Sequence, residues 1–121
     1  MGKIYEIYGS DAHAMTVSLM EAANVADMIP KEGSVALKPN LVIAGRPEDG
    51  AITHAGVLSG AISYLQSHGF DKISVIESSW VGDDTARAFK TAGYDKVCGE
   101  YHVPYYDLKH DKTRTVQTAA R

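Results

Sequence analysis

The chain of 121 residues has little cysteine, no long apolar run and no surplus of basic residues. Its one cysteine, Cys98, excludes an internal disulfide and any iron–sulfur cluster held by four cysteines of this chain alone. No apolar run approaches the roughly 20 residues that a membrane-spanning helix needs. The first seven residues also lack the apolar core of a secretory signal. We therefore expect a cytoplasmic protein that has no membrane partner.

Charge and motif content exclude further classes. The formal net charge is −3, from 12 Lys and Arg against 15 Asp and Glu. Nucleic-acid binding requires a clustered basic surface, so we expect no nucleic-acid partner. The sequence contains neither the Gly-x-Gly-x-x-Gly dinucleotide fingerprint nor the phosphate-loop motif. These absences disfavour a standard nicotinamide or ATP site.

What the chain does contain is an alternation of strand-like and helix-like segments. The expected strands are residues 3–8, 34–42, 71–79 and 103–108. A helix is expected after each of the first three. This order predicts an α/β fold, a three-layer sandwich with a mainly parallel sheet that is Rossmann-like or flavodoxin-like. We expect strand 34–42 to be central because it is almost continuously apolar, and strand 3–8 to lie at an edge.

Local signals set the ends of these elements. Ser10 and Asp11 are both candidate caps of the first helix, whose apolar face would run on as far as Ile29. Pro39 should interrupt strand pairing, because it has no N–H to donate. Residues 43–52 form a loop longer than the usual connection of about 2–6 residues, so we interpret them as a candidate mobile flap. Gly69 suits a left-handed helix end.

The helix after this loop carries two more signals. Thr53 is expected to cap it, and Gly56 and Gly60 lie one turn apart, which would let the helix approach the sheet closely. Residues 1–108 are expected to form one α/β domain. Residues 109–121 are polar and lack periodicity, so we interpret them as a tail or as the start of a missing continuation.

Polar residues gather where strands end and helices begin. In open α/β sheets these ends share one rim, at which ligands usually bind. The candidates at such positions are Lys38, Asn40, Thr53, His54, Glu77, Ser78, Ser79 and Trp80. The histidines show no metal-ligand spacing with one another, so we expect no metal site.

Three of these residues are candidate catalytic residues. Lys38 would bind an anion or act as a base; alternatively it is a strand-end lysine that reaches to solvent. Glu77 ends an apolar strand, where a carboxylate needs a partner, and Lys38 is the expected one. A catalytic pair and a structural pair look alike in sequence. His54 would bind a ligand or transfer protons, or it is a surface histidine.

The other five candidates are interpreted as ligand-binding. Asn40 either contacts a ligand or fixes its own loop, and Thr53 opens a helix whose free amides would favour an anion. Ser78 and Ser79 would donate hydrogen bonds or cap a helix; neither lies in the hydrolase elbow Gly-x-Ser-x-Gly. Trp80, the only tryptophan, would stack on a ligand or pack in the core.

Four elements occur in a fixed order: Lys38-Pro39-Asn40-Leu41, Thr53-His54, Glu77-Ser78-Ser79-Trp80-Val81-Gly82 and Tyr106-Asp107-Leu108. In these elements the sequence resembles the amino-terminal part of the family called domain of unknown function 362, over about residues 33–109. The resemblance implies the fold and the place of the site, but no reaction. Longer members carry a ferredoxin-like segment whose cysteines are expected to hold 4Fe-4S clusters. This chain has no such ligands, so the resemblance implies an incomplete domain whose cofactor is unknown.

Three functions stay open at this point. The first is an α/β subdomain that binds a small anion or metabolite, with the reaction unknown. The second is an accessory domain of a longer iron–sulfur redox protein. The third is a structural or interaction domain without its own activity. An incomplete domain would expose an apolar sheet edge or face, so we also expect a homo-oligomer or contact with a missing C-terminal part.

Overall fold

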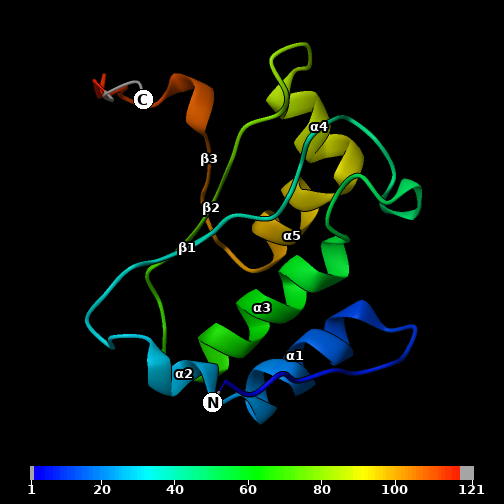
Figure 1. The fold of residues 1–121 in the computed structure, drawn as a ribbon, viewed down its shortest axis with the longest axis vertical. Coiled ribbons are helices and arrows are strands. Elements are labelled where there is room, and N and C mark those ends of the chain that lie inside the picture. The colour runs from blue at the N-terminus through cyan, green and yellow to red at the C-terminus, as the bar shows by residue number, and fades with distance from the viewer. Residues whose placement is uncertain (1, 118–121) are drawn as a thin grey trace.

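Three parallel strands form the sheet on which the rest of the chain is arranged (Figure 1). The computed structural model describes residues 2–117. The strands are β1 (Val35–Leu37), β2 (Ile73–Glu77) and β3 (Tyr105–Asp107), in the order β1-β2-β3. The helices are α1 (Ala12–Ala22), α2 (Val25–Met28), α3 (Ala55–Ser67), α4 (Thr85–Ala92) and α5 (Tyr94–Glu100), and the short 3₁₀ helices are η1 (Pro47–Asp49) and η2 (Leu108–His110).

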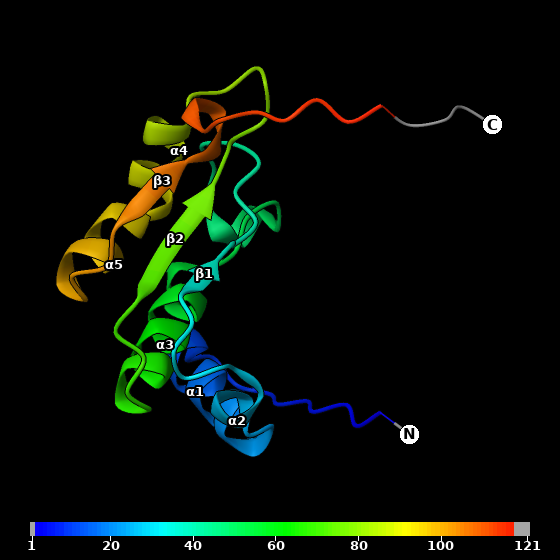
Figure 2. The same cartoon turned by 90° about the vertical axis from the view of Figure 1, so that its left-hand side faces the viewer.

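The connections between the strands place the helices. α3 joins β1 to β2, and α4 with α5 joins β2 to β3. Two crossovers of the same hand that advance in the same direction bring their helices to the same face of a sheet. Figure 2 shows the strands in front of α3, α4 and α5. α1 packs against α3. The expected α/β class with a parallel sheet is confirmed, and the arrangement is consistent with a fragment of a Rossmann-like or flavodoxin-like sheet.

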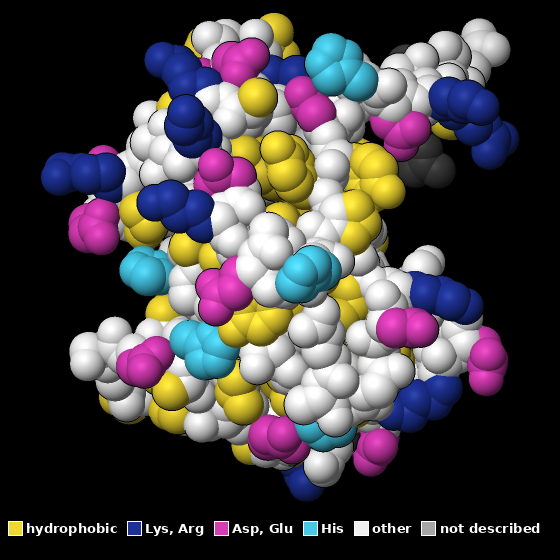
Figure 3. Space-filling model, turned by 180° about the vertical axis from the view of Figure 1, so that it is seen from behind, with side chains coloured by type: hydrophobic (Ala, Val, Ile, Leu, Met, Phe, Trp, Pro, Cys, Tyr) yellow, Lys and Arg dark blue, Asp and Glu magenta, His cyan; other side chains and the backbone are white. Residues whose placement is uncertain are grey.

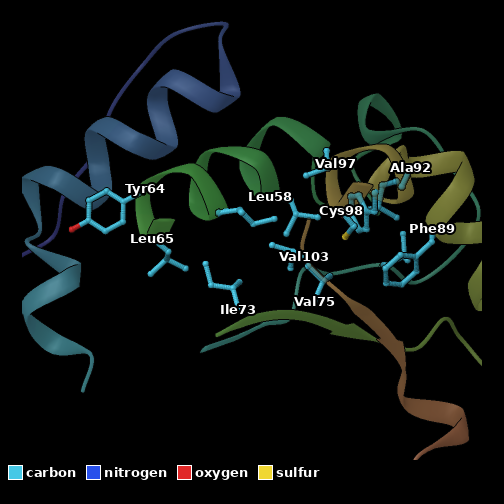
Figure 4. Packing of buried hydrophobic residues seen from close by; sticks show 14 of the residues in the cluster. Leu58, Tyr64, Leu65, Ile73, Val75, Phe89, Ala92, Val97, Cys98 and Val103 are labelled. Carbon is cyan, nitrogen blue, oxygen red and sulfur yellow. The ribbon is translucent and has the colours of Figure 1, made fainter. Parts of the chain in front are cut away.

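The hydrophobic core lies between the sheet and these helices (Figure 4). Ile73 and Val75 point from β2 toward Leu58 and Leu65 of α3, and all four are buried. Phe89 of α4 extends this core toward β3. Burying one such side chain contributes about 1.5–3 kcal/mol, so this layer holds the helices on the sheet and fixes the position of the strand ends.

Two of the expected helix ends are confirmed. Asp11 caps α1 by accepting a hydrogen bond from the N–H of Ala14 at 3.0 Å. Gly69 follows α3 with a φ of +84°, a conformation that glycine adopts without strain. The N–H of Phe70 then returns to the carbonyl of Leu65 at 3.0 Å. Because these signals depend on residues that are adjacent in the chain, they can be predicted from the sequence.

The strand expected at residues 3–8 is wrong: these residues pair with no described strand. Ile4 is 95% exposed and Tyr8 is 85% exposed. The strand expected at 34–42 is shorter than expected, since β1 covers only Val35–Leu37 and pairing stops before Pro39, as expected for a residue without an N–H. β2 rather than β1 occupies the centre of the three described strands.

The first helical segment and the glycine pair also differ from expectation. Asn24 has a φ of 50°, so the chain breaks into α1 and α2 instead of one helix that runs to Ile29. Gly56 and Gly60 face α1 rather than the sheet: a Cβ atom on Gly60 would lie 2.6 Å from the carbonyl oxygen of His13. Among residues 2–117, no helix has the length and apolar character needed to span a bilayer.

Candidate functional site

The expected pair of Lys38 and Glu77 forms at the carboxyl end of the sheet. The ammonium Nζ of Lys38 lies 2.8 Å from Oε2 of Glu77. The Glu77 side chain is only 4% exposed, whereas that of Lys38 is 56% exposed. The second carboxylate oxygen, Oε1, accepts the N–H of Ser78 at 2.8 Å. The buried carboxylate therefore fixes one side of a lysine whose outer side faces solvent.

Two hollows at this end of the sheet share Lys38 and Asn40 in their linings. One of about 320 Å³, which we call the Lys38 hollow, is lined by Lys38, Asn40, Leu41, Val42, Glu77, Ser78, Ser79, Trp80 and Val81. The other, of about 260 Å³, is lined by residues that include Lys38, Asn40 and Thr53. Seven of the eight sequence candidates thus lie on these two adjoining surfaces. His54 lines neither.

Two hydrogen bonds join Asn40 and Thr53. The N–H of Asn40 donates to the Thr53 hydroxyl at 3.0 Å, and the N–H of Thr53 donates to the Asn40 carbonyl at 2.8 Å. The Asn40 side-chain amide donates to the carbonyl of Ala51 at 2.8 Å. Together with an antiparallel bridge between Leu41 and Ile52, these bonds close the base of the 43–52 loop. The loop-fixing alternative for Asn40 is confirmed.

His54, not Thr53, caps α3. Its ring atom Nδ1 accepts the N–H of Gly56 at 2.9 Å, so the ring carries its proton on Nε2 in this arrangement. The expected cap at Thr53 is wrong because the Thr53 hydroxyl is used by Asn40. The same bond occupies one of the first-turn amides that an anion at the start of α3 would need.

Tyr94, which sequence reasoning did not single out, holds the backbone at Thr53. Its hydroxyl donates to the Thr53 carbonyl at 2.6 Å, and the residue is fully buried. Burial raises the pKa of Tyr94 to about 12, and the nearby charge of Glu77 adds to the shift while the bond to Thr53 opposes it. Tyr94 therefore stays neutral and structural at physiological pH.

Ser79 and Lys109 fix the loop after β2. The Ser79 hydroxyl donates to the Asp83 carbonyl at 2.8 Å and accepts from Lys109 Nζ at 2.7 Å. The same ammonium donates to the carbonyls of Asp83 at 2.6 Å and Trp80 at 3.1 Å. Sequence reasoning missed Lys109. Its place directly after the third strand, at the rim position of the sheet, was the signal that could have found it.

Trp80 projects from this loop and is 63% exposed, so the core-packing alternative is wrong. Its backbone N–H donates to the Val42 carbonyl at 2.7 Å. The indole ring covers Gly82: a Cβ atom on Gly82 would lie 2.1 Å from Cζ3 of the ring. Only glycine leaves room for this ring position.

Asp83 links the loop after β2 to the 43–52 loop. Its Oδ2 accepts the N–H of Ala44 at 2.8 Å, and its Oδ1 accepts the N–H of Asp84 at 2.7 Å and pairs with Arg87. The bond from Ala44, with the Arg87 guanidinium beside it, lowers the pKa of Asp83 to about 2. The carboxylate form therefore holds the two loops together.

We expect this link to weaken only in strong acid. Because the folded pKa of about 2 lies below the usual 3.8, the stabilisation is complete above about pH 4 and is lost as the pH falls through about 2. Asp83→Asn should lower the free energy of unfolding at pH 6 and make less difference near pH 2, as measured by urea unfolding. Asp71→Asn, at an exposed site, is the control. A loss that is the same at both pH values would contradict this assignment.

The described part of the chain indicates neither a metal site nor a reactive thiol. Within residues 2–117, no group of three or more His, Cys, Asp or Glu side chains is placed to hold a metal ion. Burial raises the pKa of the Cys98 thiol to about 11, so this side chain behaves as a core residue. Figure 3 shows acidic and basic side chains interspersed over one face of the molecule, without a broad area of one sign.

Comparison with known proteins gives one match. The family model described as domain of unknown function (DUF362) matches residues 35–121, which include all of the candidate site residues. No curated protein and no solved structure matched the chain. Because the match covers well over half of the sequence, the chain belongs to the DUF362 family.

Proposed function

We propose that the Lys38 hollow binds a small anionic metabolite, through a carboxylate or phosphate group. The observation that carries this proposal is the half-exposed ammonium of Lys38, held 2.8 Å from the buried carboxylate of Glu77 at the edge of a hollow of about 320 Å³. A lysine ammonium has three N–H donors. Glu77 takes one of them, which leaves the outer ones for a ligand.

The pair supports binding more than proton abstraction. The Nζ of Lys38 donates a hydrogen bond to Glu77 at 2.8 Å, and an ammonium has only N–H donors and no lone pair with which to act as a base. Glu77 in turn partly offsets the attraction of Lys38 for an anion. Weak affinity is therefore expected, at about the millimolar level that a few contacts supply. The proposal concerns binding, and it leaves the reaction unassigned.

Ser78 adds a second polar group to the same wall. Its N–H donates to Glu77, whereas its hydroxyl makes no hydrogen bond within residues 2–117. The side chain lines the Lys38 hollow and is partly exposed. A hydroxyl beside an ammonium is a common arrangement for phosphate and carboxylate oxygens, because both groups donate hydrogen bonds.

An amide NMR titration with inorganic phosphate tests the proposal. We expect shifts at Lys38, Ser78 and Trp80, with a Kd of about 1 mM, and at least a tenfold loss of affinity in Lys38→Met. Lys38→Arg should retain binding, because it keeps the charge. Lys96→Met, on the exposed side of α5, is the control for a change in net charge. Absence of shifts at these residues with both phosphate and acetate would overturn the proposal.

A further inference from the structure

The Lys38 hollow has an apolar wall that a bare anion would not use. Three apolar residues line it: Leu41 is buried, Val42 is 41% exposed and Val81 is 92% exposed. Trp80, at 63% exposed, completes this wall. Ligand sites commonly combine a largely apolar lining with a few polar groups that fix orientation. Here the ammonium of Lys38 supplies the polar group.

Trp80 is held in place before any ligand arrives. Its backbone N–H donates to the Val42 carbonyl, its backbone carbonyl accepts from Lys109 Nζ, and its ring lies against Gly82. The loop that carries it is fixed by the hydrogen bonds of Ser79 and Asp83. A side chain that is already ordered loses little conformational entropy on binding. The fixed backbone and the contact with Gly82 limit where this exposed indole can lie, and such a ring is suited to contact a flat ligand.

We propose that the ligand is an aromatic or heteroaromatic carboxylate or phosphate. Its anionic group would pair with Lys38, and its ring would stack on Trp80 between the side chains of Val42 and Val81. This inference rests on the function proposed above and narrows it to a ligand class. A hollow of about 320 Å³ has room for one such ring with its anionic group.

Phosphate monoesters that differ only in the attached group test the ligand class. We expect phenyl phosphate to bind about tenfold more tightly than methyl phosphate, since aromatic contact adds to the same ionic contact. Cyclohexyl phosphate, which is apolar but not flat, should fall between them. Trp80 is the only tryptophan, so its fluorescence, excited at a wavelength that phenyl phosphate does not absorb, and its indole N–H signal report directly on this wall.

Variants separate the two proposals. In Trp80→Leu, phenyl phosphate should bind no more tightly than methyl phosphate, while Trp80→Phe should keep most of the difference. If methyl and phenyl phosphate bind the wild type equally well through Lys38, the aromatic inference is wrong and the anion site stands. If neither binds, both proposals fail. A Trp80 signal that changes with protein concentration rather than with ligand would show that a second copy covers the wall, which would also overturn the inference.

Discussion

Gly60→Ala should lower the free energy of unfolding by about 1–3 kcal/mol, the usual range for overpacking a well-packed contact. The added Cβ would lie 2.6 Å from the carbonyl oxygen of His13 and 2.8 Å from Cβ of Thr16. Since the first of these is a backbone atom of α1, a rotamer change does not relieve the contact, and α1 and α3 must move apart. Urea unfolding followed by circular dichroism measures the loss.

Gly99→Ala is the matched control. Gly99 lies in α5, and its added Cβ would have no atom within 4 Å. Alanine is favoured over glycine in a helix by about 1 kcal/mol, so this variant should be neutral or slightly stabilised. Both substitutions change helix propensity in the same direction, and the difference between them isolates the steric contact with α1. If Gly60→Ala is as stable as Gly99→Ala, the close packing of α1 on α3 is wrong.

The glycine pair shows how far the sequence could be read. Spacing of one turn correctly indicated a close approach, but nothing in it says which neighbour approaches. Sequence likewise does not identify the neighbour of segment 3–8. Its apolar and charged residues mix as in an edge strand, although no described strand pairs with it. The same limit explains why β2 and not β1 is central. Periodicity reports one segment at a time, whereas pairing joins segments that lie far apart in the chain.

Local chemistry explains the break in the first helix. Apolar spacing continues past Asn24, but asparagine adopts the left-handed conformation at little cost, and its φ of 50° ends α1 there. The helix ends that were predicted correctly, at Asp11 and Gly69, depend on the residue itself and its immediate neighbours.

The candidate site also has features that the sequence predicted and features that it did not. The rule that strand ends and helix starts share a rim placed Lys38 beside Glu77 and brought Ser78, Ser79 and Trp80 to one hollow. The partners of the remaining polar groups did not follow from that rule. The Thr53 hydroxyl is taken by Asn40, so His54 caps α3 with its own ring. Which polar groups form these hydrogen bonds depends on how the loops pack, and spacing along the chain does not give this.

The pair of Lys38 and Glu77 should couple more strongly than the exposed pairs of this protein. Lys38→Met leaves the carboxylate of Glu77, 4% exposed, with the N–H of Ser78 as its remaining partner. An unpaired buried charge is costly, but Lys38 is itself half exposed and water partly replaces it, so we expect a loss of about 1–3 kcal/mol. Glu77→Gln in the Lys38→Met background should restore part of that loss, because it removes the charge.

A double-mutant cycle from urea unfolding measures this coupling, which we expect to reach about 1–2 kcal/mol. The same cycle on Arg46 and Asp49, a pair at 3.4 Å whose side chains are 76% and 52% exposed, should give less than about 0.5 kcal/mol. Equal coupling in both pairs would contradict the role of burial. Phosphate titration of Glu77→Gln then tests how the Glu77 carboxylate affects anion binding by Lys38. If Glu77 competes with a ligand for the Lys38 ammonium, Glu77→Gln binds phosphate more tightly; if the carboxylate is needed to orient Lys38, affinity falls.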